Sequence, residues 1–160
     1  MPAAYYKSPI GVIKITEEEN VITSIYALDE EHDVLPPQTP LLQQAVRELD
    51  EYFAGTRKIF ELPLQQQGSA FQQQVWDELC KIGYGKTISY MQQSRFMNNP
   101  LGIRAIASAN GKNHILIVVP CHRVIGSDGS LTGFGAGIWR KKWLLEHEAR
   151  VMGVGQTSLF

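Results

Sequence analysis

The sequence contains no long hydrophobic run and no leader-like start. Its longest unbroken aliphatic run, residues 115–119, is far shorter than the roughly 20 residues that a membrane-spanning helix needs. The first residues, MPAAYYKSPIG, form neither a basic leader followed by an apolar stretch nor a small-residue cleavage site. These absences predict a soluble, cytoplasmic protein that has no membrane partner.

Cysteine and histidine are too sparse for a disulfide scaffold or a structural metal site. The chain has 2 cysteines, Cys80 and Cys121, and none of its 4 histidines lies in a metal-binding spacing with another histidine or with a cysteine pair. We therefore expect reduced thiols and no metal, with Cys80 in the core beside Leu79. The 160 residues, 44% of them hydrophobic, are enough for one domain or two small ones.

Charge is distributed unevenly along the chain. Residues 1–68 hold 5 Lys and Arg against 11 Asp and Glu, whereas residues 69–160 hold 10 against 5. A cationic second half favours a polyanionic partner, although solvated surface charge alone would give the same pattern. The polar stretch 65–68, which ends in glycine, is typical of a short linker. We predict an N-terminal α/β domain over 1–67 and a C-terminal domain over 68–160.

The first domain has the pattern of a β-hairpin. Residues 11–16 alternate between the two faces of a strand, and a second β-rich run follows over 21–26. Residues 18–20 form the expected turn between them.

A helix is expected to cover this small sheet. Apolar residues recur at helical spacing from Leu41 to Phe53, and Gly55 marks the end of the helix. Residues 59–64 could add a strand, which Pro63 would confine to an edge. The first domain shows no catalytic pattern.

Three short helices are expected in the second domain. Ser69-x-x-Gln72 is a capping box that starts a helix ending at the glycines 83 and 85, and Ser89-x-x-Gln92 starts a shorter one. The third helix is expected to begin with Asn99 as its cap and Pro100 in its first turn, and to stop at Gly111. Tight turns between short helices are typical of a helix-turn-helix, although any small helical bundle gives the same pattern.

The third helix carries small side chains where a major-groove reader would carry long polar ones. We expect Ile103, Ile106 and Ala107 to face the core. Small residues let a helix backbone approach a narrow groove, and a single arginine among them could enter the base stack. The residues expected away from the core are Arg104, Ala105, Ser108 and Ala109.

Cys121 and His122 follow the apolar run 115–119, which reads as a buried strand ended by Pro120. A thiolate is a nucleophile, and an imidazole held by a carboxylate can take its proton. Neighbouring residues on a strand face opposite sides, so this pair can cooperate only across a turn or through water. Glu148 leans toward the apolar face of the last helix, from about residue 138, and is the carboxylate candidate. A buried structural cysteine and a backbone-capped histidine are the alternative.

The second domain resembles a known family over about residues 71–148. The segments that carry the resemblance are VWDELCKIGYGKTISY, RAIASANGKN, ILIVVPCHRVIGSDGSLTGF and RKKWLLEHE, centred on Pro120-Cys121-His122-Arg123-Val124. Together they resemble the methylated-DNA-protein-cysteine S-methyltransferases, also called O6-alkylguanine-DNA alkyltransferases. The first domain is loosely similar to the family's variable N-terminal domain through its opening Ser8-Pro9-Ile10-Gly11. The resemblance implies an α/β (α+β) protein: a small antiparallel, ribonuclease-H-like sheet with a covering helix, followed by a helical domain with a winged-helix-like helix-turn-helix.

The resemblance also implies catalytic roles. Cys121 matches the alkyl acceptor, His122 the base that acts through a water, and Glu148 the carboxylate that orients this base. Asn113 matches the asparagine that braces the turn before the cysteine. Tyr90 matches the tyrosine that helps to rotate the nucleotide and donates a proton toward the purine.

The implied partner is double-stranded DNA that bears O6-alkylguanine and is bound through its minor groove. Arg104 matches the finger that replaces the extruded nucleotide in the duplex. The other expected DNA contacts are Ala105, Ser108, Tyr90 and Arg123. We expect a monomer that can cluster on DNA, and no organic cofactor.

The base pocket is implied to use mostly backbone groups. Carbonyl groups of Cys121 and Val124 would read the base, while a backbone N–H in the loop around Phe134 and Gly135 would contact its O6 edge beside Tyr90. Relatives often carry tyrosine at the Phe134 position and serine or alanine in the glycine-rich loop, so tolerance of bulky alkyl groups stays open.

The function implied is direct-reversal DNA repair by a suicidal, single-turnover methyltransferase. An O6-alkylguanine, or as a further candidate an O4-alkylthymine, is flipped out of the duplex and its alkyl group passes irreversibly to Cys121. The alternatives are a non-reacting protein that binds alkyl lesions and a cysteine hydrolase that uses Cys121 and His122. A sister group that binds lesions without repairing them carries tryptophan at the cysteine position, and Cys121 argues against that alternative.

Overall fold

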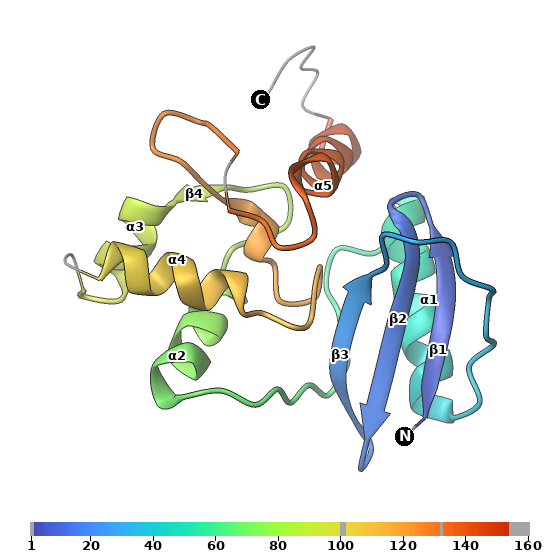
Figure 1. The fold of residues 1–160 in the computed structure, drawn as a ribbon. Helices are drawn as coiled ribbons and strands as arrows, with labels where there is room; N and C mark the ends of the chain where they lie inside the picture. Colours follow the sequence, from blue (N-terminus) through green and yellow to red (C-terminus); the bar gives the residue numbers. More distant parts are fainter. Residues whose placement is uncertain (1, 100–101, 132, 154–160) are drawn as a thin grey trace. The chain divides into compact units, whose positions relative to one another are not determined.

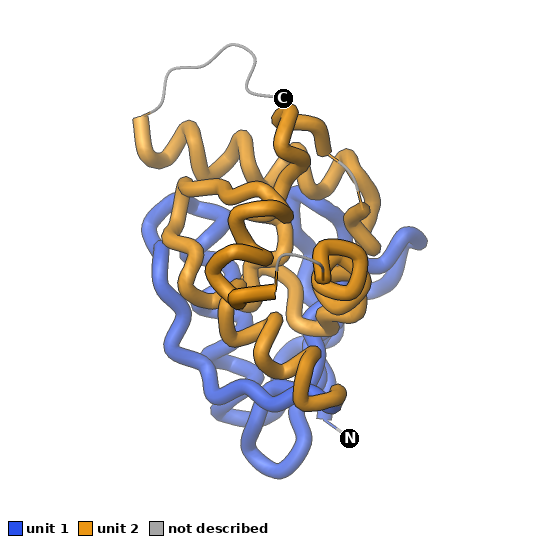
Figure 2. The backbone as a smooth tube through the Cα atoms, turned by 90° about the vertical axis from the view of Figure 1, so that its left-hand side faces the viewer, with its two compact units in different colours: residues 1–67 blue, residues 68–160 orange. Residues whose placement is uncertain are grey.

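The chain folds into two compact units, residues 1–67 and residues 68–160 (Figures 1 and 2). The structure is a computed structural model that describes residues 2–99, 102–131 and 133–153. No helix within these ranges is long and apolar enough to cross a membrane.

Unit 1 is built on a three-stranded antiparallel sheet in the order β1-β2-β3. Its strands are β1 (Ala3–Ser8), β2 (Gly11–Glu18) and β3 (Val21–Ala27). Glu19 and Asn20 connect β2 to β3 with φ angles of 49° and 66°, the left-handed geometry of a tight hairpin turn. The predicted hairpin is confirmed. Strand β1 was not predicted, because among its residues only Ala4 is buried and its pattern is weak.

Helix α1 (Pro40–Ala54) packs against β1 and β2, as predicted (Figure 1). The Thr39 side chain caps its first turn by accepting from Leu42 N, and Gly55 ends it with a left-handed φ of 82°. The strand expected over residues 59–64 does not form. Its segment makes a single bridge, at Leu64, because Pro63 has no N–H to donate to a ladder.

Unit 2 begins with α2 (Ala70–Leu79) and α3 (Tyr90–Phe96), and both predicted capping boxes are formed. Helix α2 ends at Leu79, before the glycines expected to stop it. The N–H groups of Lys81 and Ile82 donate to carbonyls three residues back, so the chain tightens and leaves the α-helical pattern. This position leaves Cys80 exposed, so the expectation of a core cysteine is wrong.

Helix α4 (Ile103–Gly111) lies between α2 and α3 (Figure 1). The residue at its N-cap is Gly102, and the expected cap at Asn99 is wrong because the Asn99 N–H bonds Ser94 O and so closes α3. The expectation for Pro100 lies outside the described residues. Two buried contacts hold α4: a reciprocal amide pair between Gln93 and Asn110, at 3.0 and 2.8 Å, and the Trp76 indole N–H on the Ala109 carbonyl at 2.9 Å.

The remaining elements surround the cysteine. Residues Cys121–Arg123 form a 3-10 turn, η1, and a parallel pair joins β4 (Ile88–Ser89) to β5 (Val124–Ile125). Helix α5 (Ile138–Val151) packs against η1 and begins at the residue expected from the sequence.

Candidate active site

The segment before the cysteine is a compact turn, not the predicted strand. The Asn113 side chain accepts from Ile115 N at 3.0 Å and donates to Ile115 O at 3.3 Å and to Val119 O at 2.8 Å. Within the turn, Ile117 takes a φ of 71°, a rare value for a β-branched residue. The predicted strand is wrong because an apolar run indicates burial, and a buried strand and a buried turn have the same apolar pattern.

Asn113 also holds the thiol of Cys121. Its Nδ2 donates to Sγ at 3.3 Å, and Cys121 itself is buried at the start of η1. Burial raises the pKa of the Cys121 thiol, while the hydrogen bond from Asn113 and the charge of Lys141 lower it. Burial is the largest of these effects, so the pKa of the thiol stays above its usual value, and the two contacts reduce the increase without reversing it.

His122 is paired with Glu148 deep inside unit 2. The imidazole Nε2 lies 2.7 Å from Glu148 Oε2, and both side chains are at most 1% exposed. Burial lowers the pKa of His122, and Glu148 opposes that shift, so the imidazole is neutral near neutral pH. With Glu148 ionised, Nε2 donates the hydrogen bond and Nδ1 is left as the proton acceptor. Among the described residues, none hydrogen-bonds to this buried Nδ1.

Arg123 completes the network, which contradicts its expected role in DNA binding. Its Nε donates to Glu148 Oε1 at 2.9 Å, its Nη2 to Oε2 at 3.1 Å, and its Nη1 to the Ile82 carbonyl at 2.7 Å. The guanidinium is buried and cannot reach a phosphate in this arrangement. Sequence reasoning had no signal for a contact that joins residues 25 positions apart.

Glu148 stays ionised because several groups donate to it. Burial raises its pKa, but His122 and Arg123 outweigh this effect and hold the pKa of the carboxyl well below its usual range. Gly85 adds a backbone N–H at 3.1 Å, and its φ of 74° explains the glycine at this position. Glu148 thus fixes both the orientation and the tautomer of His122.

The residues expected to line the base pocket lie in several elements of unit 2. Tyr90 is half-buried at the start of α3, and Val124 is fully buried in β5. Phe134 is half-buried and Gly135 exposed in the loop before α5, where Arg140 ties the loop down by donating to the Ala136 carbonyl at 2.9 Å. A Cβ atom at position 135 would meet only the Gly111 carbonyl, at 3.7 Å.

Several cations of unit 2 and one histidine are buried, although their sequence gives no sign of it. Arg140 and Lys141 are buried at the start of α5, so with Arg123 three of the ten basic residues of the second domain are not on its surface. The cationic surface is correspondingly smaller than the charge count indicates. His147 is also buried, and its ring stacks on Trp143 at 4.9 Å between ring centroids.

The outer face of α4 carries the residues expected to contact DNA. Arg104, Ala105 and Ser108 are all exposed. Ala109, expected on the same side, is 2% exposed and lies under the Trp76 indole, which corrects that expectation. The helix therefore presents one long cationic side chain among small ones.

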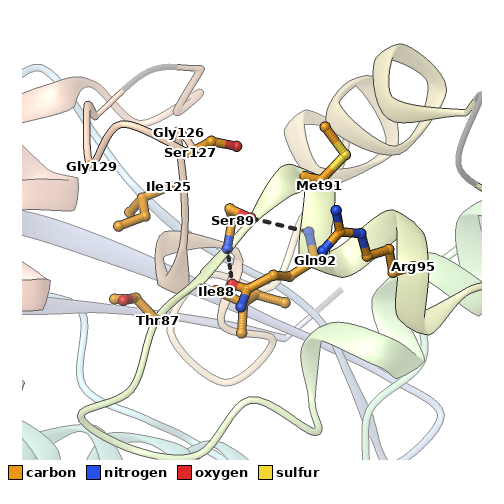
Figure 3. A pocket seen from close by; sticks show the side chains of 10 residues that line it. All are labelled: Thr87, Ile88, Ser89, Met91, Gln92, Arg95, Ile125, Gly126, Ser127 and Gly129. Atoms are coloured by element: carbon orange, nitrogen blue, oxygen red, sulfur yellow. Dashed lines mark hydrogen bonds between the residues drawn. The ribbon is translucent and has the colours of Figure 1, made fainter.

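A hollow of about 560 Å³ lies beside α3 and does not include Cys121 (Figure 3). It is formed where the start of α3 meets β4 and the loop after β5. Ser89 and Gln92 exchange their capping-box hydrogen bonds at its centre (Figure 3). The side chains that can form hydrogen bonds in its lining are Thr87, Ser89, Gln92, Arg95 and Ser127.

The fold and the site define a class of protein: a unit of short helices that carries a buried cysteine beside a His-Glu-Arg network. A family model described as the DNA binding domain of 6-O-methylguanine DNA methyltransferase matches residues 70–150, and one described as its ribonuclease-like domain matches residues 1–66.

Relatives match along nearly the whole chain. The constitutive methylated-DNA–protein-cysteine methyltransferase of Bacillus subtilis is 40% identical over 151 residues, which cover 89% of this chain and 92% of that protein. The crystal structure of Mycobacterium tuberculosis O6-methylguanine methyltransferase has a TM-score of 0.84 at 37% identity, covering 99% of this chain and 98% of that one. The structure of M. tuberculosis OGT in complex with DNA has a TM-score of 0.83 at 40% identity, with 92% of each chain covered.

This chain belongs to the 6-O-methylguanine DNA methyltransferase family. It is an enzyme of direct-reversal DNA repair, and the α/β fold class and the family predicted from its sequence are confirmed.

Proposed function

We propose that this protein transfers the alkyl group of O6-alkylguanine in duplex DNA to Cys121, once per molecule. The observation that carries the proposal is the setting of the thiol: Asn113 donates to Sγ, and the neighbouring His122 is held by an ionised Glu148. Both lie in unit 2, which the family model of a DNA binding domain matches. The relatives' names, methylated-DNA–protein-cysteine methyltransferase, support the same acceptor chemistry.

Activation of the thiol comes first. His122 Nδ1 accepts the thiol proton through a bridging water, since no described hydrogen bond links the imidazole directly to Sγ. Glu148 stabilises the imidazolium that forms, and Asn113 stabilises the thiolate. Arg123 keeps Glu148 charged and in place.

The transfer is a single displacement at the alkyl carbon. The thiolate forms a carbon–sulfur bond as the bond between that carbon and O6 breaks, and the electron pair passes into the purine. Tyr90 donates a proton toward the purine, which makes the base a better leaving group. The product is S-alkylcysteine. Because a thioether has no electrophilic carbonyl that water could attack, the protein is not regenerated.

The thiol is buried, so a stacked base cannot reach it. The base must leave the duplex, at a cost of about a few kcal/mol for unstacking and unpairing. We infer that Arg104 enters the gap while α4 lies in the minor groove; its exposure on α4 among small residues supports this role. Ala105 and Ser108 allow the close approach. The lesion, by weakening base pairing, reduces the cost.

Contacts with the DNA backbone are proposed at the hollow beside α3. Hydroxyl, amide and guanidinium groups are those that commonly bind phosphate oxygens, and this hollow offers all three. Arg95 supplies the charge. The proposed assembly is a monomer bound to duplex DNA.

Arg104→Ala is the test of base extrusion. We expect the variant to repair O6-methylguanine in duplex DNA at least about tenfold more slowly, since loss of roughly 1.4 kcal/mol changes an equilibrium tenfold. Its reaction with free O6-benzylguanine should stay within twofold of the wild-type rate, because a free base needs no extrusion. Both rates are measured in single-turnover reactions. Equal slowing on both substrates would remove Arg104 from this role.

A further inference from the structure

The buried part of α3 is polar, not apolar. Two side chains of this helix are buried, Gln93 and Ser94, whereas its apolar side chains Met91 and Phe96 are exposed. The Ser94 hydroxyl donates within its own helix, to the Met91 carbonyl at 2.7 Å. Gln93 instead reaches Asn110 in the last turn of α4. Gln93 is therefore the buried side chain through which α3 bonds to α4.

The two amides form a closed pair. Gln93 Nε2 donates to Asn110 Oδ1 at 3.0 Å, and Asn110 Nδ2 donates to Gln93 Oε1 at 2.8 Å. Both residues are at most 4% exposed. Apolar contacts are non-directional, whereas two hydrogen bonds between the same side chains are satisfied in one relative placement. The pair therefore fixes how α3 is rotated against α4.

The end of α4 is itself fixed within unit 2. The Trp76 indole N–H bonds the carbonyl of Ala109, the residue before Asn110, at 2.9 Å. The Asn113 N–H donates to the Asn110 carbonyl at 3.3 Å, and the Asn113 side chain donates to Cys121 Sγ. The amide pair thus joins α3 to the turn that leads to the thiol.

Tyr90 is the residue whose placement depends on the rotation of α3. It lies three residues before Gln93, so the two are neighbours on the helix surface. Its hydroxyl lies beside the loop before α5, because a Cβ atom at Gly133 would be 3.4 Å from the hydroxyl oxygen. The β4–β5 pair holds the chain just before α3, and the amide pair holds the helix one turn later. Losing the second of these restraints would free the Tyr90 hydroxyl to move.

We propose that Gln93 and Asn110 are positioning residues of the alkyl transfer, whose paired amides hold the Tyr90 hydroxyl where it donates toward the purine. The proposal rests on the function proposed above, in which Tyr90 assists departure of the base and Cys121 accepts the alkyl group. Two apolar side chains would fill the same space without fixing the rotation of α3. The buried amides then have a reason that packing alone does not give.

Replacing both amides by apolar side chains of similar size tests the proposal. Gln93→Met combined with Asn110→Leu leaves no amide without its partner, and such paired replacements are nearly neutral for stability. We expect methyl transfer from a duplex that contains O6-methylguanine to slow at least about tenfold in single-turnover reactions, since a misplacement of about 1 Å can cost about a hundredfold. Gln74→Met is the matched control, because it makes the same change at an exposed position of α2. Its rate should equal that of the wild type.

Tyr90→Phe separates positioning from a merely structural role. If the amides act through the Tyr90 hydroxyl, their replacement has no further effect once that hydroxyl is gone. The variant that combines all three substitutions should then transfer within about twofold of Tyr90→Phe alone, because effects that share one route do not add. Alkylation of Cys121 by iodoacetamide needs no tyrosine, so its rate in the paired variant should stay within about twofold of wild type, with Cys80 separated by peptide mapping.

Three results would overturn the proposal. These are wild-type transfer by the folded paired variant, slowing by the same factor with and without the Tyr90 hydroxyl, and an equal loss of iodoacetamide reactivity. If the paired variant does not fold, Asn110→Ala replaces it in the same comparison, because the smaller side chain leaves room for a water beside Gln93. Its rates are interpreted in the same way.

The wild type and Tyr90→Phe separate this proposal from the function on which it rests. A wild-type protein that gains no methyl group on Cys121 contradicts the proposed function, and this proposal with it. If the wild type transfers the methyl group and Tyr90→Phe is equally fast, Tyr90 loses its role and the amide pair has nothing to position. If Tyr90→Phe is slow, the paired variant tests the amide pair alone.

Discussion

Cys121→Ala is expected to abolish methyl transfer while keeping affinity for methylated duplex DNA within a few-fold of wild type. In the proposed reaction the sulfur is the nucleophile, and none of the side-chain hydrogen bonds described for α4 involves it. Removing one small buried group costs roughly 1 kcal/mol of stability, which leaves the fold intact. The measurement is transfer of labelled methyl from the duplex to protein, alongside a binding titration at fixed salt.

Cys80→Ala is the matched control for this experiment. Cys80 is the other cysteine of the chain and lies exposed at the end of α2, so its removal should leave methyl transfer unchanged. Methylated protein formed by Cys121→Ala would exclude Cys121 as the acceptor. A wild-type protein that binds the lesion tightly and never gains a methyl group would be a non-reacting binding protein, and repeated turnover of an acyl substrate would indicate a hydrolase.

Glu148→Gln is expected to lower the free energy of unfolding by about 3–5 kcal/mol at pH 7, because it leaves the buried charge of Arg123 without its counterion. Transfer to Cys121 should also slow, since a neutral amide supports the imidazolium of His122 less well. Urea unfolding measures the first effect and single-turnover kinetics the second. Glu146→Gln, on the exposed side of α5, should change stability by less than about 0.5 kcal/mol.

The acid stability of the wild type follows from the same network. The pKa of Glu148 is held below its usual range, so its stabilising contribution is present above the unfolded pKa of about 4.3 and is lost as pH falls below that value. The pKa of His122 is also lowered by burial, so the unfolded chain takes up a proton first and stability declines below about pH 6.5. Glu148→Gln should keep the loss of stability below about pH 6.5 that comes from His122. It should lack the additional loss below about pH 4.3 that comes from Glu148. If the free energy of unfolding fell equally with pH in the wild type and in Glu148→Gln below about pH 4.3, Glu148 would not contribute to acid stability.

Local signals in the sequence were sufficient for most helices. Both capping boxes and the Gly55 stop depend on residues a few positions apart, and these elements formed as predicted. The segment 115–119 failed because its conformation is set by the Asn113 side chain, which replaces the ladder of a strand with hydrogen bonds inside the turn. Apolar composition reported burial correctly there, but it could not distinguish a strand from a turn.

The site was partly accessible from the sequence. The helical spacing of α5 turned Glu148 inward, and the structure places it against His122. Arg123 was misassigned and Lys141 overlooked, since a charged residue is usually exposed and only a tertiary partner reveals the exception. Arg123 pairs with Glu148, and Lys141 lies over the ring of Tyr90. Each of these partners lies on an element distant in the sequence, so no local pattern could have predicted the contact.

Intact-protein mass spectrometry after mixing with excess O6-methylguanine duplex tests the central claim most directly, followed by peptide mapping of the modified residue. The account predicts the gain of a single methyl group, located on Cys121, with the reaction stopping at one equivalent per chain. A methyl group on another residue, or continued release of repaired DNA beyond one equivalent, would contradict it.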